Sequence, residues 1–179
     1  TGVWLWDLRT GKRARTYNPQ DDEPWFAFSP DGTRIVVAEE RLAVYPTDSE
    51  EPLDGFASPM VEFKAPRFSA DGRWVYAVND DGDAFQIDAA TGEVKETWKA
   101  PDETLSDPLA VGPDAALVAA VDGAGGIRIW DPRTGKGPAV DRLPRLEAPA
   151  FTADGKTVWC LDYDNRVHGF DAATGKRLK

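Results

Sequence analysis

The chain has 179 residues, of which 41% are apolar and 29% charged, a balance that is ordinary for a globular protein with a buried core. Its formal net charge of −10 argues against nucleic-acid binding, because affinity for phosphate groups comes mainly from lysine and arginine. The single cysteine, Cys160, excludes an internal disulfide framework and a cysteine-rich zinc site.

No apolar run is long enough for a membrane-spanning helix, and the N-terminus does not read as a signal peptide. Together with the cysteine usage, this favours a cytoplasmic location. A periplasmic or other extracytoplasmic location stays open, because Thr1 stands in the middle of a sequence pattern and a signal segment could precede it.

Two short motifs recur along the chain and divide it into repeats. The first, D-x-x-T-G, runs from Asp7 to Gly11, from Asp88 to Gly92, from Asp131 to Gly135 and from Asp171 to Gly175. The second, [ST]-x-D-G, begins at Ser29, Ser69 and Thr152, with a degenerate copy at Gly112. Both motifs recur about every 40 residues, a period that is typical of a β-propeller blade with four short strands.

Each repeat predicts the same succession of strands, which we name a to d from the propeller axis outward. Strand a ends on Phe28, Phe68, Val111 and Phe151 in successive repeats. Strand b is an apolar run such as 35–38 or 75–78, which is typical of a strand buried on both faces. Strand c covers 3–6, 42–45, 84–87, 127–130 and 167–170, and strand d follows it, as at 94–98.

The repeats predict one all-β domain over residues 1–179, a β-propeller of four-stranded antiparallel blades. Its parts are a half blade, three blades and a nearly complete blade, at 1–20, 21–60, 61–101, 102–144 and 145–179. This is about four and a half blades, and we expect them to belong to a larger ring of about six to eight. Open blade edges would expose apolar faces and favour self-association.

The D-x-x-T-G motif has a structural explanation that needs no function. The aspartate can accept a backbone N–H two residues later, and the glycine supplies the positive φ of a short hairpin between strands c and d. The second repeat departs from this pattern, because Pro46 replaces the aspartate and a longer segment, 47–52, follows. Irregular loops on a regular scaffold are where binding specificity is usually found.

Two families resemble these repeats. Trp6-Asp7, Trp130-Asp131 and the segment 28–32 are similar to WD repeats, although the Gly-His dipeptide of that family is absent. The segments 88–98 and 171–175 resemble the repeats of quinoprotein-type propellers, some of which bind pyrroloquinoline quinone. We weight the WD-like resemblance, in divergent copies of bacterial type, above the quinoprotein-like one.

Residues that could carry chemistry are few. His168 has no partner motif, and its position on strand c suggests a partly exposed surface residue. The acidic loop 79–83 lacks the spacing of a calcium loop and reads as a solvated hairpin, while Cys160 reads as a small core residue. The sequence therefore predicts a protein that is not an enzyme and that binds no metal or cofactor.

We expect a protein-interaction scaffold, because propellers resembling this one bind proteins through loops and through the rim of the central channel. The partner-binding candidates are Asp21, Asp22, Trp25, Arg67 and Asp107. Trp25 has no aligned tryptophan in the other repeats, whereas Trp6, Trp130 and Trp159 fall at positions that favour packing. The alternative is a quinoprotein-like or periplasmic propeller that binds a small molecule or forms part of an enzyme.

Overall fold

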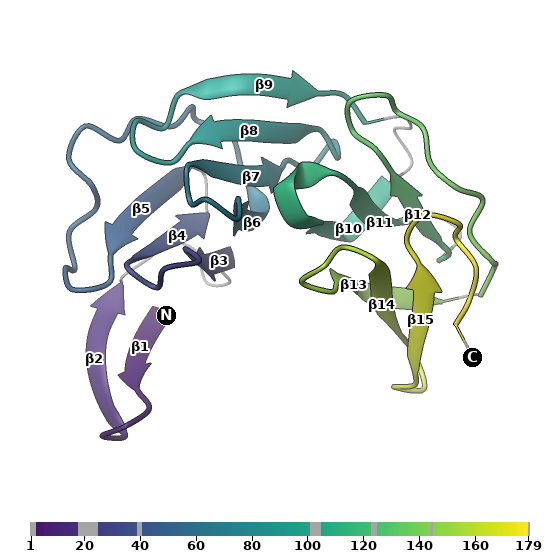
Figure 1. Cartoon of the computed structure of the whole chain (residues 1–179), viewed down its shortest axis with the longest axis horizontal. Helices are drawn as coiled ribbons and strands as arrows, with labels where there is room; N and C mark the ends of the chain where they lie inside the picture. The colour runs from purple at the N-terminus through teal and green to yellow at the C-terminus, as the bar shows by residue number, and fades with distance from the viewer. Residues whose placement is uncertain are drawn as a thin grey trace.

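The computed structural model describes residues 3–17, 25–38, 41–100, 105–122, 125–143 and 145–178, without the side chains of 105–109 and 114. Across these ranges the chain forms antiparallel sheets and one short 3-10 turn, η1 (Pro113–Ala115). The prediction of an all-β propeller is confirmed. Figure 1 shows the sheets arranged around an open arc, with β1 and β2 at one end and β13 to β15 at the other.

Five sheets follow one another along the chain, and each holds strands from one repeat. The first is β1 (Val3–Asp7) with β2 (Lys12–Tyr17), and the second has the order β3 (Trp25–Phe28), β4 (Arg34–Ala38), β5 (Leu42–Pro46). The third has the order β6 (Lys64–Phe68), β7 (Trp74–Val78), β8 (Ala84–Asp88), β9 (Val94–Trp98). The fourth comprises β10 (Leu105–Val111), β11 (Val118–Asp122) and β12 (Ile127–Trp130), and the fifth β13 (Leu146–Phe151), β14 (Thr157–Asp162) and β15 (Val167–Asp171).

The predicted strands a, b and c all form, and strand a lies on the concave side of the arc. β3, β6, β10 and β13 are these inner strands, and neighbouring ones lie side by side (Figure 1). Strand b pairs on its outer edge with strand c in each sheet of three or more strands. We refer below to each sheet and its outer segment as a blade, numbered one to five in chain order.

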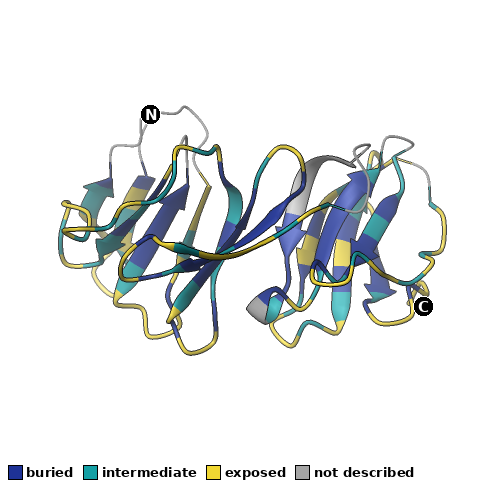
Figure 2. Cartoon of the chain, turned by 90° about the horizontal axis from the view of Figure 1, so that it is seen from above, coloured by how far each residue is buried: buried dark blue, intermediate teal, exposed yellow. Residues whose placement is uncertain are grey.

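The hydrophobic core is divided into clusters that lie between successive blades. One cluster joins Val36 and Ala38 of β4 to Val75 and Ala77 of β7, and others join blade three to four and four to five. Figure 2 shows buried residues on the strands and exposed ones mainly in the turns. Because each b strand packs against both neighbours, β4, β7 and β11 are almost wholly buried, as the apolar runs predict.

The D-x-x-T-G turns have the geometry that the motif predicts. In the third blade the Gly92 N–H donates to the Asp88 carbonyl at 2.9 Å, and the Ala90 and Thr91 N–H groups donate to the Asp88 carboxylate. The glycines of all four copies have φ between +66° and +76°. These bonds lower the pKa of the Asp88 and Asp171 carboxyl groups, chiefly through their backbone and threonine donors.

Strand d is where the blades differ. In the described part of the chain, only blade three has four paired strands. In blade two the segment after Pro46 is irregular and touches strand c through the Leu53 N–H, which donates to the Val44 carbonyl at 2.7 Å. Blade four has a single bridge, Asp131 to Lys136, and blade five a single bridge, Phe170 to Arg177.

Candidate functional site

The four inner strands share one concave surface, and this surface is the candidate site. A pocket of about 230 Å³ is lined by residues of β3, β6, β10 and β13 together. Its lining is mostly apolar, with Trp25 and Phe26 at one end and Phe151 at the other. A concave apolar surface built from several elements is the usual form of a binding site in a rigid scaffold.

Three of the inner strands carry a β-bulge at a proline. The register of each strand shifts around Ala65-Pro66, Asp107-Pro108 and Ala148-Pro149. Ala65 and Ala148 have φ of +48° and +50°, which is unusual for residues with a side chain. Bulges of this kind re-aim side chains and are enriched next to functional sites.

The bulges were not predicted, although the sequence carries a signal for them. A dipeptide ending in proline stands shortly before the end of strand a in the third, fourth and fifth repeats. Proline cannot donate to the sheet ladder, so within strands it is confined to edges and bulges. Pro66, Pro149 and Ala65 line the shared pocket as a result.

Trp25, one of the predicted binding residues, lies at the rim of the shared pocket. Its side chain is 39% exposed, and Phe26 and Phe28 on the same strand are about half exposed. Trp25 and Ala27 face blade three, whereas Phe26 and Phe28 are paired with Val37 and Ile35 and face blade one. Such exposure of three large apolar side chains on one short strand is typical of an interaction surface.

Arg67 also lines this pocket, so the structure brings two of the predicted binding residues together. Its Nη1 donates to the Val111 carbonyl at 2.9 Å, which ties strand a of blade three to strand a of blade four. Arg67 is half-buried, and its guanidinium therefore has a structural contact as well as an exposed part. Arg34 on β4 links blade two to blade three in a similar way, because its Nη2 donates to the Gly72 carbonyl in the turn between β6 and β7.

The other binding candidates are placed less fully. Asp107 lies in the bulge of β10, and its side chain is outside the description. Asp21 and Asp22 lie outside the described residues altogether.

The packing role predicted for three tryptophans is confirmed for one and wrong for two. Trp130 is 1% exposed and lies in the cluster between blades three and four. Trp6 is 53% and Trp159 42% exposed, because each lies in a sheet at one end of the arc, which has a described neighbour on one side only. The repeat position alone does not decide burial; a neighbouring blade is also needed.

The prediction of a partly exposed His168 is wrong. The residue is 8% exposed, because strand c of blade five is covered by the C-terminal segment. Its Nε2 lies 2.9 Å from Asp162 Oδ2, and the Arg177 Nη2 lies 2.9 Å from Nδ1. Since arginine can only donate, Nδ1 accepts and Nε2–H donates to Asp162, whose pKa is lowered mainly by this bond.

The predictions for Cys160 and for the acidic loop 79–83 have different outcomes. Cys160 is a buried core residue, as predicted, and burial raises the pKa of its thiol to about 12. The loop 79–83 is a hairpin but is not fully solvated, because the Asp83 carboxylate is buried against Lys99 and accepts the Ala100 N–H at 3.0 Å. The salt bridge to Lys99, the residue after strand d, was not foreseeable from the turn pattern.

Within the described ranges, no three residues among histidine, cysteine, aspartate and glutamate are close enough to hold a metal ion. None of the helical structure seen in those ranges is long and apolar enough to cross a membrane.

The radial sheets, their a-to-d order and the concave inner surface define a segment of a β-propeller. The comparisons then give the family. A sequence profile described as outer membrane protein assembly factor BamB matches residues 27–179, and the chain belongs to this family of quinoprotein-type propeller repeats.

A curated relative matches a shorter part of the chain. It is eukaryotic translation initiation factor 3 subunit I of Scheffersomyces stipitis, 27% identical over 116 residues. The match covers 55% of this chain and 33% of the relative, so the chain spans about a third of that protein. Since this relative is a WD-repeat homologue, each of the two resemblances in the sequence finds support.

Proposed function

We propose that this chain is a non-enzymatic scaffold that binds a partner protein through the concave surface of its inner strands. The observation that carries the proposal is the apolar pocket shared by β3, β6, β10 and β13, with Trp25 exposed at its rim. Tryptophan is among the side chains that most often dominate the binding energy of protein interfaces. The WD-like resemblance supports the same function.

The chemistry of the pocket indicates what the partner presents. Its walls are apolar, and the guanidinium of Arg67 already bonds a backbone carbonyl, so an aliphatic or aromatic side chain fits better than an acidic one. The proline bulges hold the inner strands in one shape, which lowers the entropy cost of binding.

Replacing Trp25 tests this proposal. We expect Trp25→Ala to weaken partner binding by about 30-fold, because a hot-spot aromatic contributes roughly 2 kcal/mol or more. The matched control is Trp159→Ala, since Trp159 is similarly exposed but lies on the outer face of blade five. Affinity purification with the wild type and both variants as bait, followed by titration of the recovered partner, measures the effect.

Two results would reject the concave surface. One is equal affinity of the wild type and Trp25→Ala. The other is an unchanged set of recovered proteins when Asp21, Asp22, Trp25, Arg67 and Asp107 are all replaced together.

Self-association is a second candidate function of the exposed apolar surface. A pocket of about 340 Å³ lies between β1 and β3, and Trp4, Trp6 and Phe28 are exposed along it. Sedimentation velocity of the wild type and Trp6→Ser decides the point. A mass that rises with concentration in the wild type and not in the variant supports association here, and a monomer at all concentrations rejects it.

Binding of a quinone cofactor is the alternative that the family membership favours. Adding pyrroloquinoline quinone and calcium tests it, because a ligand of the folded state raises the melting temperature. At 100 times Kd the stabilisation is about 2.7 kcal/mol, a shift of roughly 5 to 10 °C for a chain of this size. An unchanged melting temperature supports the scaffold.

A further inference from the structure

Within the part of the chain that the structure describes, the outer edge of β12 in blade four has no full partner strand. In blade three the equivalent strand, β8, pairs with β9 from Ala84 opposite Trp98 to Ile87 opposite Val94. Alignment on Asp88 and Asp131 places Ile127 at the position of Ala84. Among the described residues of blade four, the pairing on this edge is the bridge from Asp131 to Lys136, and Gly137 lies against the Ile129 carbonyl, so the edge is open near Ile127.

The chain's own strand d cannot fill this position, because it is bound to the next blade. After Gly137, the segment 138–143, here called the strap, turns away from β12; it begins with Pro138, which has no N–H to donate. The Asp141 N–H donates to the Gly175 carbonyl at 3.0 Å, and the Arg177 N–H donates to Asp141 Oδ2 at 2.8 Å. These bonds hold the strap on blade five.

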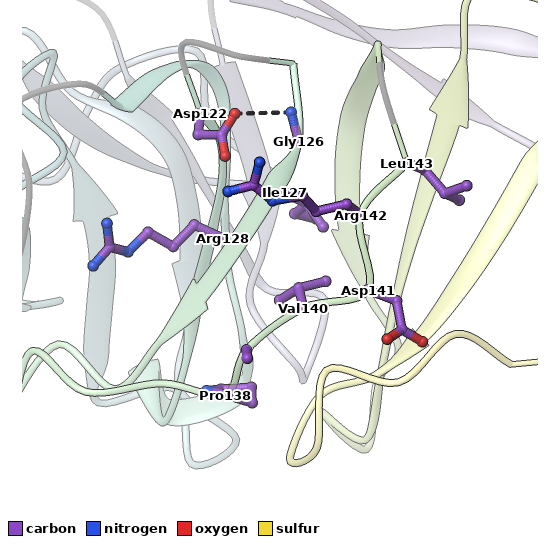
Figure 3. Close-up of a pocket in the computed structure, with 10 residues that line it drawn as sticks. Asp122, Gly126, Ile127, Arg128, Pro138, Val140, Asp141, Arg142 and Leu143 are labelled. Atoms are coloured by element: carbon purple, nitrogen blue, oxygen red, sulfur yellow. Dashed lines mark hydrogen bonds between the residues drawn. The ribbon is translucent and has the colours of Figure 1, made fainter.

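A pocket of about 390 Å³ separates the strap from β12 (Figure 3). Ile127 lies on one side, and Val140 and Leu143 lie on the other. The side chain of Arg142 extends across the pocket over Ile127 toward Asp122, whose Oδ1 accepts the Gly126 N–H at 2.8 Å. The pocket therefore combines an open strand edge and apolar side chains with four charged residues, Asp122, Arg128, Asp141 and Arg142.

We propose that this pocket binds an extended peptide segment of a partner protein, which pairs with the outer edge of β12 and places an aromatic side chain against Val140, Leu143 and Arg142. Strand addition of this kind takes affinity from main-chain hydrogen bonds and specificity from pockets for alternate side chains.

Blade three shows which chemistry suits the position. There the residue at the corresponding point of strand d is Trp98, and it faces the next blade, with its ring 4.9 Å from the Arg133 guanidinium carbon. In blade four a residue opposite Ile127 would face the strap in the same sense, beside Arg142. The aligned residue of the chain itself is Asp141, which is turned to blade five. An aromatic residue of another protein would take, in blade four, the position that Trp98 occupies in blade three.

The probe is a fluorescein-labelled pentapeptide with the sequence of residues 95–99, because this segment fills in blade three the position that is open in blade four. Fluorescence polarisation measures its binding to the full chain. We expect saturable binding, a loss of about tenfold when the probe's tryptophan is replaced by alanine, and a similar loss when alternate backbone nitrogens are methylated. The methylated probe keeps every side chain and loses the donors for strand pairing.

Arg142→Gln locates the site on the protein. We expect this variant to bind the probe about threefold to fivefold more weakly, the size of a partly exposed cation–π contact. The matched control is Arg145→Gln, since Arg145 is an exposed arginine nearby that lines a different pocket, beside His168. Trp25→Ala is a second control, and it should bind the probe as the wild type does.

The results of these binding measurements test the peptide site at β12 independently of the proposed binding at the concave surface. Equal binding of the methylated and unmethylated probes overturns strand addition, and equal effects of Arg142→Gln and Arg145→Gln overturn the location. Loss of probe binding in Trp25→Ala assigns the peptide to the inner strands instead. Absence of saturable binding at millimolar probe also rejects the proposal.

Discussion

Trp6 and Trp130 stand at the same position of their repeats, at the end of strand c and directly before the D-x-x-T-G turn, and they have opposite environments. Trp130 is enclosed by residues of β7, β8 and β11 and is 1% exposed, whereas Trp6, on β1 at the end of the arc, is 53% exposed. The same repeat residue therefore contributes differently to stability in the middle of the arc and at its ends. In a repeat protein, stability is a sum of the repeats and of the interfaces between neighbours.

The largest expected effect comes from truncating these two residues. Trp130→Ala should lower the free energy of unfolding by about 3 to 5 kcal/mol, because it leaves a cavity in a closed core. Trp6→Ala should cost less than about 1 kcal/mol, since little surface is buried there. Urea denaturation followed by circular dichroism measures both.

Trp130→Phe sharpens the same comparison. Within the described part of the chain, the buried Trp130 Nε1 has no hydrogen-bond partner. Because phenylalanine removes this unsatisfied group, the variant should lose far less stability than Trp130→Ala. A loss as large as that of alanine would show that the shape of the indole, rather than its buried area, decides the packing.

The turn glycines give a second matched pair, with a smaller effect. Gly92, in blade three, has φ of +76°, and a Cβ there would lie 2.7 Å from backbone atoms of Ala57 and Ser58. Gly11, at the end of the arc, has φ of +66° and open space around it. Gly11→Ala should cost about 1 to 2 kcal/mol for the left-handed backbone alone, and Gly92→Ala roughly twice that.

Melting temperatures of the two variants provide the measurement. If Gly11→Ala and Gly92→Ala lower the melting temperature equally, the close approach of the irregular segment of blade two to the Gly92 turn contributes nothing to stability.

The smallest expected effect concerns the [ST]-x-D-G turns of Asp31 and Asp154. Asp31 accepts bonds from the Ser29 hydroxyl and from the N–H and hydroxyl of Thr33, which lower its pKa from 3.8 to about 2. Asp154 accepts from Thr152 and from the Lys156 N–H, which also lower its pKa. A depressed pKa in the folded state stabilises it above the unfolded pKa, and this contribution is lost as the pH falls from about 4 to about 2.

An NMR titration of the Asp31 carboxyl carbon checks this directly. We expect a midpoint near 2 in the wild type and a higher one in Thr33→Val, which removes the extra hydroxyl donor and makes the turn resemble that of Asp154. A wild-type midpoint near 3.8 would show that these bonds do not persist in solution.

The sequence predicts the strands and turns well, because both depend on local chemistry. The a strands end at Phe28, Phe68, Val111 and Phe151 as predicted, and the apolar runs form the b strands. The D-x-x-T-G turn is specified by its own five residues. They include the glycine with positive φ and the aspartate whose carboxylate accepts the N–H groups two and three residues later. No long-range information is needed for either.

The features that were missed depend on neighbours in space. The burial of His168 comes from Arg177, which returns over strand c. The exposure of Trp159 comes from its place in the last sheet of the arc, where no further sheet follows among the described residues. The repeat pattern predicts a strand d after strand c in blade four, where the strap is found. Nothing in Gly137-Pro138 shows that Asp141 will bond to the next blade instead. The cytoplasmic location of the chain stays a prediction.

The prolines of the inner strands have a consequence for aggregation. Strand a is an edge strand, and a row of four such edges along a concave surface could act as a template for β-strands of other molecules. Pro66, Pro108 and Pro149 each remove one N–H from that row, in three of the four strands. The prolines therefore oppose the edge-to-edge stacking of strands that leads to fibrils.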